Sequence, residues 1–186
     1  MPGGLVEKVV AIHEALTDAK LPHAFGGALA LAWCVGTPRA TLDVDVNVFI
    51  AETDAELLVG ALPIGVGLAR DDIAALARDG QARLWWQETP VDVFLNSTPL
   101  HEPAASRARW EVFGGTRMPF LSCLDTAIFK AFFNRTKDWS DLEEMARARR
   151  LDVQAVRETL VGALGETDER LRTLERLAQT GRAFQA

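Results

Sequence analysis

Residues 26–50 read GGALALAWCVGTPRATLDVDVNVFI, in which a glycine pair, an apolar run and an acidic strand follow one another. Successive side chains of a β-strand point to opposite faces of its sheet. We therefore expect Asp43, Asp45 and Asn47 on one face and the valines between them in a core. Neighbouring carboxylates repel each other, and hard divalent ions such as Mg²⁺ prefer carboxylate oxygens as ligands. The alternation thus predicts a metal site at this strand.

The glycine pair, Gly26 and Gly27, lies between a short strand candidate and an apolar helix. Glycine lets a backbone approach a ligand closely, and the N–H groups that open a helix attract anions. We therefore expect this turn to bind phosphate. Arg39 and Thr41 come directly before the acidic strand, where the Arg39 guanidinium would either hold phosphate oxygens or balance nearby acids.

A third acid, Asp92, stands between two valines in a later strand-like run. We expect this run to pair antiparallel with the run at residues 83–87, next to the strand that carries Asp43. Asp92 would then join Asp43 and Asp45 in one cluster, which is able to hold two divalent ions and activate a hydroxyl for attack on phosphorus. The alternative is that these acids lie on a solvated face of the sheet.

Lys130 stands in an apolar helix, where an unpaired charge is costly. Its ammonium would reach a cleft, or else extend along the apolar surface to solvent. Arg135 follows five residues later. Asp138 and Asp141 are spaced like the N-cap and N3 residues of the next helix, and Asp141 is alternatively placed to orient Lys130 or Arg135.

The order of elements predicts an α+β protein, because a small mixed sheet is followed by consecutive helices. We expect a core at residues 1–120 with a helical C-terminal region at 121–186 packed on it. The expected strands are 23–25, 41–50, 83–87, 91–95, 110–113 and 118–121. The expected helices are 5–16, 28–35, 52–62, 71–78, 124–130, 138–150, 153–164 and 168–178.

The charge distribution argues against a DNA-binding protein. The net charge is −6, and residues 1–100 carry six Lys and Arg against thirteen Asp and Glu. Tight binding to nucleic acid through phosphate contacts depends on clustered Lys and Arg. Residues 101–150 carry nine against seven, so a local basic face could still hold a triphosphate or the end of an RNA.

The remaining composition indicates a cytoplasmic protein without a membrane segment. The longest apolar run is too short to span a bilayer, and no secretory signal is evident at the N-terminus. We expect Cys34 and Cys123 to be buried free thiols rather than a disulfide. The three scattered histidines do not have the spacing of a zinc site. The five tryptophans are expected in the core rather than as base-stacking surfaces, with at least one of Trp85 and Trp86 pointing inward.

With these residues assembled, GGALALAWCVGTPRATLDVDV resembles the glycine-pair and Arg-x-Thr-x-Asp-x-Asp signature of DNA polymerase β-like nucleotidyltransferases. It is most similar to the AbiEii/MenT branch of abortive-infection and toxin–antitoxin enzymes. A second block, running from Leu124 through Lys130 and Arg135 to Asp141, is similar to that branch's lysine-arginine helix and its following acidic motif. The chain departs from the family pattern where Gly27 replaces a frequent serine.

The resemblance implies Mg²⁺-dependent transfer of a nucleoside monophosphate from an NTP, such as ATP, to an acceptor hydroxyl, with release of pyrophosphate. It implies a toxin that acts on tRNA 3′ ends and has a cognate antitoxin partner. The metal ligands would be Asp43, Asp45 and Asp92, with Asp92 also the general base. Lys130 would be both catalytic and nucleotide-binding, and the other nucleotide-binding residues would be Gly26, Gly27, Arg39, Thr41, Arg135 and Asp141.

Two alternatives stay open at this point. In the first alternative, the protein is an antibiotic-modifying nucleotidyltransferase, and its acceptor is a small hydroxylated molecule. The chain would bind nucleotide without catalysis if it were an inactive module, although a site that has lost its reaction has no reason to keep three repelling carboxylates. The preferred base of the NTP does not follow from the residues.

Overall fold

The structure, a computed structural model, describes residues 3–37 and 40–184. The described residues fall into two compact units. The first unit contains residues 3–29 and 40–121, and the second contains residues 30–37 and 122–184. The second unit therefore contains most of the helix at Gly27–Val35 and the C-terminal third of the chain.

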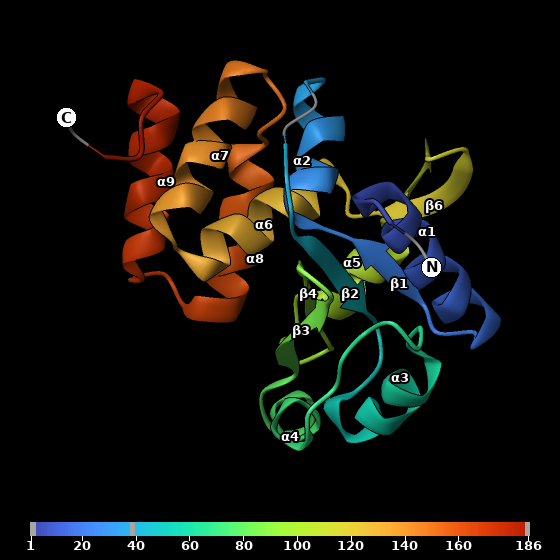
Figure 1. The fold of residues 1–186 in the computed structure, drawn as a ribbon. Coiled ribbons are helices and arrows are strands. Elements are labelled where there is room, and N and C mark those ends of the chain that lie inside the picture. The colour runs from blue at the N-terminus through green and yellow to red at the C-terminus, as the bar shows by residue number, and fades with distance from the viewer. Residues whose placement is uncertain (1–2, 38–39, 185–186) are drawn as a thin grey trace. The chain divides into compact units, whose positions relative to one another are not determined.

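The first unit is built on a six-stranded mixed sheet with the order β3-β4-β2-β1-β6-β5 (Figure 1). Parallel pairing joins β2 to β4 and β1 to β6, and the other neighbours are antiparallel. This mixed sheet confirms the predicted α+β class. The strands are β1 (His23–Phe25), β2 (Val44–Val48), β3 (Gln81–Trp86), β4 (Thr89–Phe94), β5 (Arg109–Phe113) and β6 (Thr116–Phe120).

Helices of the first unit bury apolar residues together with one face of the sheet. They are α1 (Leu5–Asp18), the start of α2 (Gly27–Val35), η1 (Glu52–Asp54), α3 (Ala55–Ala61), α4 (Arg70–Asp79) and α5 (His101–Ser106). The Phe120 ring on β6 contacts Phe25 on β1 and Phe113 on β5, with ring centroids 5.9 and 6.1 Å apart, respectively. These contacts place the core on the valine side of β2, because Phe25 pairs with the buried Val46.

Some boundaries differ from the sequence predictions. The acidic strand begins at Val44 and not at residue 41, so Asp43 lies in the turn that leads into it. Helix α5 was not predicted, because it has six residues and contains Pro103, which is tolerated only in the first turn. Helix α7 begins at Thr136, two residues before the predicted start.

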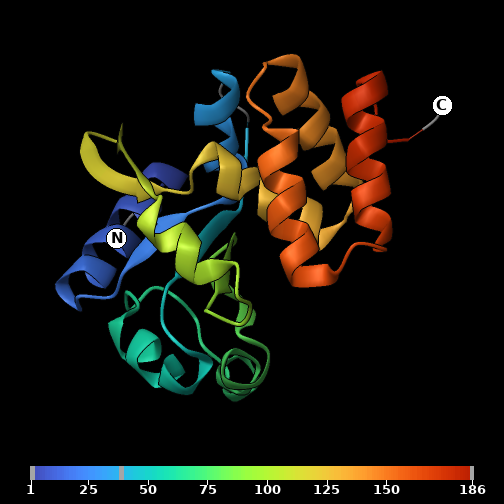
Figure 2. The same ribbon diagram turned by 180° about the vertical axis from the view of Figure 1, so that it is seen from behind.

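The second unit contains α6 (Cys123–Phe133), α7 (Thr136–Arg147), α8 (Val153–Leu164) and α9 (Glu169–Thr180). The four lie side by side in Figures 1 and 2. Side-chain caps start three of them, since Ser122, Asp152 and Asp168 accept backbone N–H bonds at 3.1, 3.0 and 2.9 Å. Among the described residues we find no helix with the length and apolar character needed to cross a bilayer.

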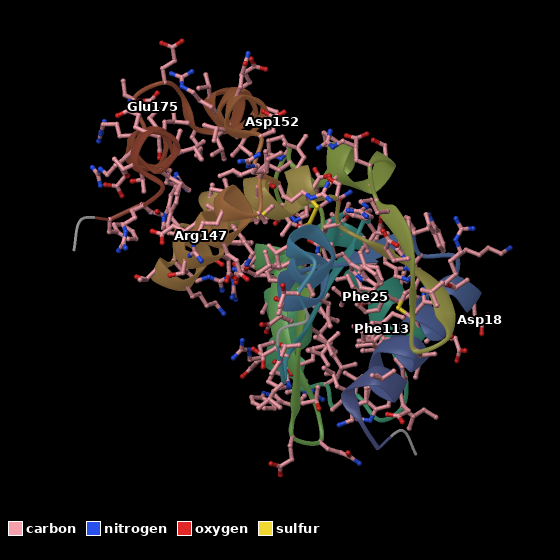
Figure 3. All side chains as sticks on the ribbon, turned by 90° about the horizontal axis from the view of Figure 1, so that it is seen from above. Asp18, Phe25, Phe113, Arg147, Asp152 and Glu175 are labelled. Atoms are coloured by element: carbon pink, nitrogen blue, oxygen red, sulfur yellow. A yellow bond between two sulfur atoms is a disulfide. The ribbon has the colours of Figure 1, made fainter. Side chains whose placement is uncertain are left out.

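A disulfide joins Cys34 on α2 to Cys123 on α6, within the second unit (Figure 3). Their Cα atoms are 5.5 Å apart. The prediction of two free thiols was therefore wrong. The two cysteines are 89 residues apart, and their spacing carries no signal that the fold brings α2 against the start of α6.

The tryptophans divide between the interior and the surface, which corrects the prediction that they belong to the core. Trp86 and Trp139 are buried, at 2% and 0% exposure. Trp85 and Trp110 are half exposed, and Trp33 is 39% exposed. On β3 the alternation of side chains sends Trp86 inward and leaves Trp85 on the opposite face of the sheet.

Candidate active site

Three carboxylates lie near one another in the first unit. Asp45 on β2 and Asp92 on β4 are direct partners in the parallel register, one step after the Val44–Val91 pair. Asp43 directly precedes β2, and its charge acts on the same Arg83 guanidinium as the charges of Asp45 and Asp92. All three residues are half-buried. We call Asp43, Asp45 and Asp92 the acidic cluster.

The glycine bend packs directly against this cluster. The Gly26 N–H donates a hydrogen bond of 2.9 Å to the backbone oxygen of Asp45. Gly27 has a φ of +54°, and a side chain at its Cα would overlap the Asp45 carboxylate. A Cβ on Gly26 would lie 3.1 Å from Nδ2 of Asn47. Glycine is required here because the acidic strand occupies the space that a side chain would need.

The strand β3 brings a guanidinium to the cluster. Arg83 pairs with Asp92 in the antiparallel register, and its Nε and Nη2 donate to the two Asp92 oxygens, both at 2.7 Å. The hydrogen bonds and charge of Asp92, together with the charges of Asp43 and Asp45, raise the pKa of Arg83. The sequence interpretation did not identify Arg83 as a site residue. The available signal was its place on a strand expected to pair with the strand of Asp92.

The donor types of the acidic cluster suit a hard cation such as Mg²⁺, because all three side chains offer carboxylate oxygens. In the arrangement described, Arg83 holds both oxygens of Asp92. Within residues 3–37 and 40–184, no group of three or more His, Cys, Asp or Glu side chains is arranged so that it could hold a metal ion as it stands. Asp92 would therefore become a metal ligand only after Arg83 shifts, which the 51% exposure of its side chain permits.

Thr41 supports the turn that presents Asp43. Its hydroxyl lies 3.2 Å from both the backbone nitrogen and the backbone oxygen of Asp43, and it accepts from the former and donates to the latter. These bonds tie the hydroxyl to the backbone in the turn before β2. Arg39, the other predicted residue of this segment, lies outside the described residues.

The remaining predicted site residues form a separate set in the second unit, which we call the buried ion network: Lys130, Arg135, Asp138 and Asp141. Lys130 Nζ donates to Asp141 at 2.7 Å and lies 3.6 Å from Asp138. Arg135 Nε donates to Asp138 at 2.6 Å. Lys130, Asp138 and Asp141 are buried, whereas the Arg135 side chain extends from them to solvent with 52% exposure. The ammonium on the apolar helix is thus paired inside the protein.

This network settles two alternatives raised by the sequence. Asp141 orients Lys130, as one of those alternatives proposed. Asp138 is not an N-cap, because Arg135 occupies that position and Asp138 is the third residue of α7. Its carboxylate instead bridges Arg135 and Lys130.

A hollow of about 490 Å³ lies at the other end of β1 from the glycine bend. His23, Phe49 and Trp110 contribute to its largely apolar lining, and Lys20 contributes a charge. His23 begins β1 whereas Gly26 follows its end, and Phe49 follows the end of β2 whereas Asp43 precedes its start. None of the residues predicted to carry chemistry lines this hollow.

Comparisons with known proteins find similarity at the level of structure. No protein-family model matches the chain, and no curated protein matches its sequence. The solution structure of the antibiotic-resistance factor ANT(2'')-Ia is 14% identical, with a TM-score of 0.53, over 94% of this chain and 91% of that one. ANT(2'')-Ia in complex with adenylyl-2''-tobramycin gives the same identity and TM-score, over 94% and 97%.

A third structure comes from Paracoccidioides brasiliensis, an antigenic nucleotidyltransferase-like protein. It is 14% identical to this chain, with a TM-score of 0.55, over 93% of this chain and 88% of that one. At these identities the likeness concerns the fold alone. The chain thus shares its fold with nucleotidyltransferases, as its sequence motifs predicted.

Proposed function

We propose that this protein transfers a nucleoside monophosphate from a Mg²⁺-bound NTP to the hydroxyl of an acceptor. The observation that carries the proposal is the contact between the acidic cluster and the glycine bend, where a side chain on Gly27 would overlap the Asp45 carboxylate. Carboxylates for a metal and backbone N–H groups for a phosphate are thereby held within one small region of the first unit.

In this proposal the acidic cluster holds magnesium once Arg83 has moved from Asp92. When bound, Mg²⁺ neutralises charge that develops on the phosphates and polarises their oxygens. Gly26 and Gly27 receive the triphosphate at the start of α2, where the backbone N–H groups of the first helical turn favour an anion, while the Gly26 N–H itself stays bonded to the Asp45 backbone oxygen. Arg39 is the second phosphate ligand that the resemblance implies.

The reaction is a substitution at the α-phosphorus. The acceptor oxygen forms a bond to that phosphorus as the bond to the oxygen bridging the α- and β-phosphates breaks, and pyrophosphate leaves. The hydroxyl proton passes to the Asp92 carboxylate, which acts as general base. Attack and departure occur in line, so the acceptor and the pyrophosphate lie on opposite sides of the phosphorus.

The roles expected for Lys130, Arg135 and Asp141 as nucleotide-binding residues remain predictions from the resemblance. The pairing of Lys130 with Asp141 supports a different primary role, which is to stabilise the second unit. For Thr41 the bonds to the Asp43 backbone support a positioning role in addition to the expected nucleotide contact.

The acceptor implied by the resemblance is the 3′ end of tRNA, which would make the protein a toxin with a cognate antitoxin. A small hydroxylated molecule is the second candidate. It is favoured by the charge of residues 1–100, which carry six Lys and Arg against thirteen Asp and Glu and include the whole acidic cluster. RNA binding draws on clustered cations, whereas an acidic surface favours a neutral or cationic acceptor.

Transfer of label from α-³²P-labelled NTPs, compared among the four nucleotides, tests this function directly. The acceptors are purified tRNA and an aminoglycoside panel that includes tobramycin, each with Mg²⁺. We expect label in one acceptor class and a loss of at least about 10³-fold in the Asp43→Ala variant, which should fold normally. Transfer that persists undiminished in Asp43→Ala would reject the proposal, and failure of the wild type to bind Mg²⁺–NTP would exclude even an inactive nucleotide-binding module.

A further inference from the structure

An exposed tryptophan lies beside the acidic cluster. Trp85 is 50% exposed and stands two residues after Arg83 on β3, so the two side chains leave the same face of the sheet. The next residue, Trp86, points into the core and is 2% exposed. The chain thus places a large apolar ring in solvent beside the Arg83–Asp92 pair.

The strand register fixes how near this ring is to the acids. Trp85 pairs with Pro90 across β3 and β4, and Arg83 pairs with Asp92. Asp92 stands two residues after Pro90 on β4 and is the partner of Asp45 on β2. Arg83, Asp92 and Asp45 thus form one row across three strands, and Trp85 lies two residues along β3 from that row. With strands about 4.8 Å apart and a rise of about 3.4 Å per residue, the Cα atoms of Trp85 and Asp92 are separated by roughly 8 Å.

The same register shows which side of the cluster Trp85 occupies. The strand order β3-β4-β2-β1 puts Trp85 on the outer strand, the acids on the two middle strands and Gly26 directly after β1. In the proposed reaction the triphosphate binds at Gly26 and Gly27. Because attack is in line, the acceptor approaches the phosphorus from the side away from the departing pyrophosphate. That side faces β3 and Trp85.

The charge of this edge restricts what can bind there. Residues 81–94, which form β3, β4 and their turn, contain Arg83 against Glu88 and Asp92. A polyphosphate chain finds no cluster of cations on this hairpin. An indole face attracts flat apolar ring surfaces and cations held above it. A sugar ring with amino substituents combines both features.

We propose that Trp85 is the residue that selects the acceptor, by stacking against the sugar ring of a small, amino-substituted molecule whose hydroxyl is the nucleophile. This assignment rests on the proposed nucleotidyl transfer and names its substrate class. Trp85 touches the acceptor and takes no part in binding the NTP.

Calorimetric titration with tobramycin, in the presence of Mg²⁺ and a non-hydrolysable NTP analogue, tests the assignment without requiring turnover. The variants are Trp85→Ala and Trp85→Phe, and the matched control is Trp110→Ala, which removes an equally exposed tryptophan from the edge strand β5. We expect Trp85→Ala to weaken tobramycin binding at least tenfold and Trp85→Phe to retain most of it. Trp110→Ala should bind as the wild type does, and all variants should bind the analogue equally.

Absence of tobramycin binding to the wild type, or equal binding by Trp85→Ala and Trp110→Ala, would overturn the assignment. Transfer of label to tRNA that is unaffected by Trp85→Ala would overturn it as well, while leaving the proposed nucleotidyl transfer in place. Failure of the transfer reaction itself is recognised separately, because the wild type would then label neither acceptor.

Discussion

In the first unit, Asp45 and Asp92 are partners on β2 and β4, Asp43 directly precedes β2, and the Arg83 guanidinium pairs with Asp92. In the second unit, two carboxylates meet an ammonium and a guanidinium. In the second set the Lys130 and Asp138 side chains are 10% and 1% exposed, and Arg135 reaches solvent with 52% exposure. In the first set all three carboxylates are half-buried, and the Arg83 side chain is 51% exposed.

This difference indicates what each set is for. A buried, balanced network leaves little capacity for a ligand, and removing one member exposes its partners to an uncompensated charge. A half-buried group of three carboxylates offers oxygen ligands to a hard cation that arrives from solvent. We therefore assign stability to the buried ion network and ligand binding to the acidic cluster, and the following experiments test that division.

The largest expected effect is on the second unit. Lys130→Met should reduce the free energy of unfolding by about 3–5 kcal/mol, because Asp138 and Asp141 lose their buried ammonium. Urea denaturation monitored by circular dichroism measures the change. Lys137→Met, at an exposed lysine of α7, is the control and should change little. A Lys130→Met protein as stable as the control would contradict the division of roles.

Lowering the pH should reduce the folding stability of the first unit, which contains all three histidines of the chain. Burial, with a smaller contribution from the charge of the neighbouring His13, lowers the pKa of His23 to about 4. The unfolded state, with a pKa of about 6.5, binds the proton first. The contribution of neutral His23 to the free energy of unfolding is thus fully present above pH 6.5. It falls by about 1.4 kcal/mol per pH unit as the pH drops towards 4.

In the second unit, hydrogen bonds from Arg170 lower the pKa of Asp168 to about 2, so its contribution is lost only as the pH falls below the unfolded value of 3.8 towards 2. Hydrogen exchange measured by mass spectrometry between pH 7 and 4.5 separates the two units. We expect protection to fall earlier in the strands of the first unit. If α7 and α8 lost protection from hydrogen exchange over the same pH range, the expected difference between the two units would be wrong.

The contact between the glycine bend and the acidic cluster is tested by two matched substitutions. Gly27 and Gly115 both have positive φ, but a Cβ on Gly115 meets nothing within 4 Å. Gly115→Ala should cost about 1–2 kcal/mol from backbone conformation alone. Gly27→Ala should cost about 1–3 kcal/mol more, because its side chain overlaps Asp45. Equal losses in thermal denaturation would show that the bend is not packed against β2.

A smaller effect is expected from the guanidinium beside Asp92. Arg83→Gln leaves the acidic cluster without that positive charge, so Mg²⁺ affinity in the absence of nucleotide should rise by about tenfold, or about 1.4 kcal/mol. Magnesium titration by calorimetry reads this out. Arg78→Gln, at an exposed arginine paired with Asp79 on α4, is the control. An unchanged affinity would mean that Arg83 and magnesium do not compete for Asp92.

The parts of the fold that depend on local pattern were predictable from the sequence. The helix predicted at residues 153–164 has those bounds as α8, since an Asp152 cap and a following glycine mark its ends. The alternation around Asp45 and the glycine pair were likewise local features. Their contact follows from a short helix that returns the chain to the same sheet.

Features that depend on long-range pairing were not predictable. Arg83 meets Asp92 because of one particular register between β3 and β4. Cys34 and Cys123 meet because α2 packs against the start of α6. For Arg83 and for the two cysteines the residue types were visible, and their partners were not. The contact of Lys130 with Asp141 was one of two alternatives offered by the sequence, and the angle of the connection between the two helices decides in its favour.

Calorimetric binding of an NTP analogue with and without Mg²⁺, in the wild type and in Asp45→Asn, tests the assignment of the acidic cluster most directly. We predict binding by the wild type that requires Mg²⁺ and weakens at least about tenfold in Asp45→Asn, with the fold of the variant intact by circular dichroism. Binding of equal strength in the variant, or without magnesium, would contradict the account.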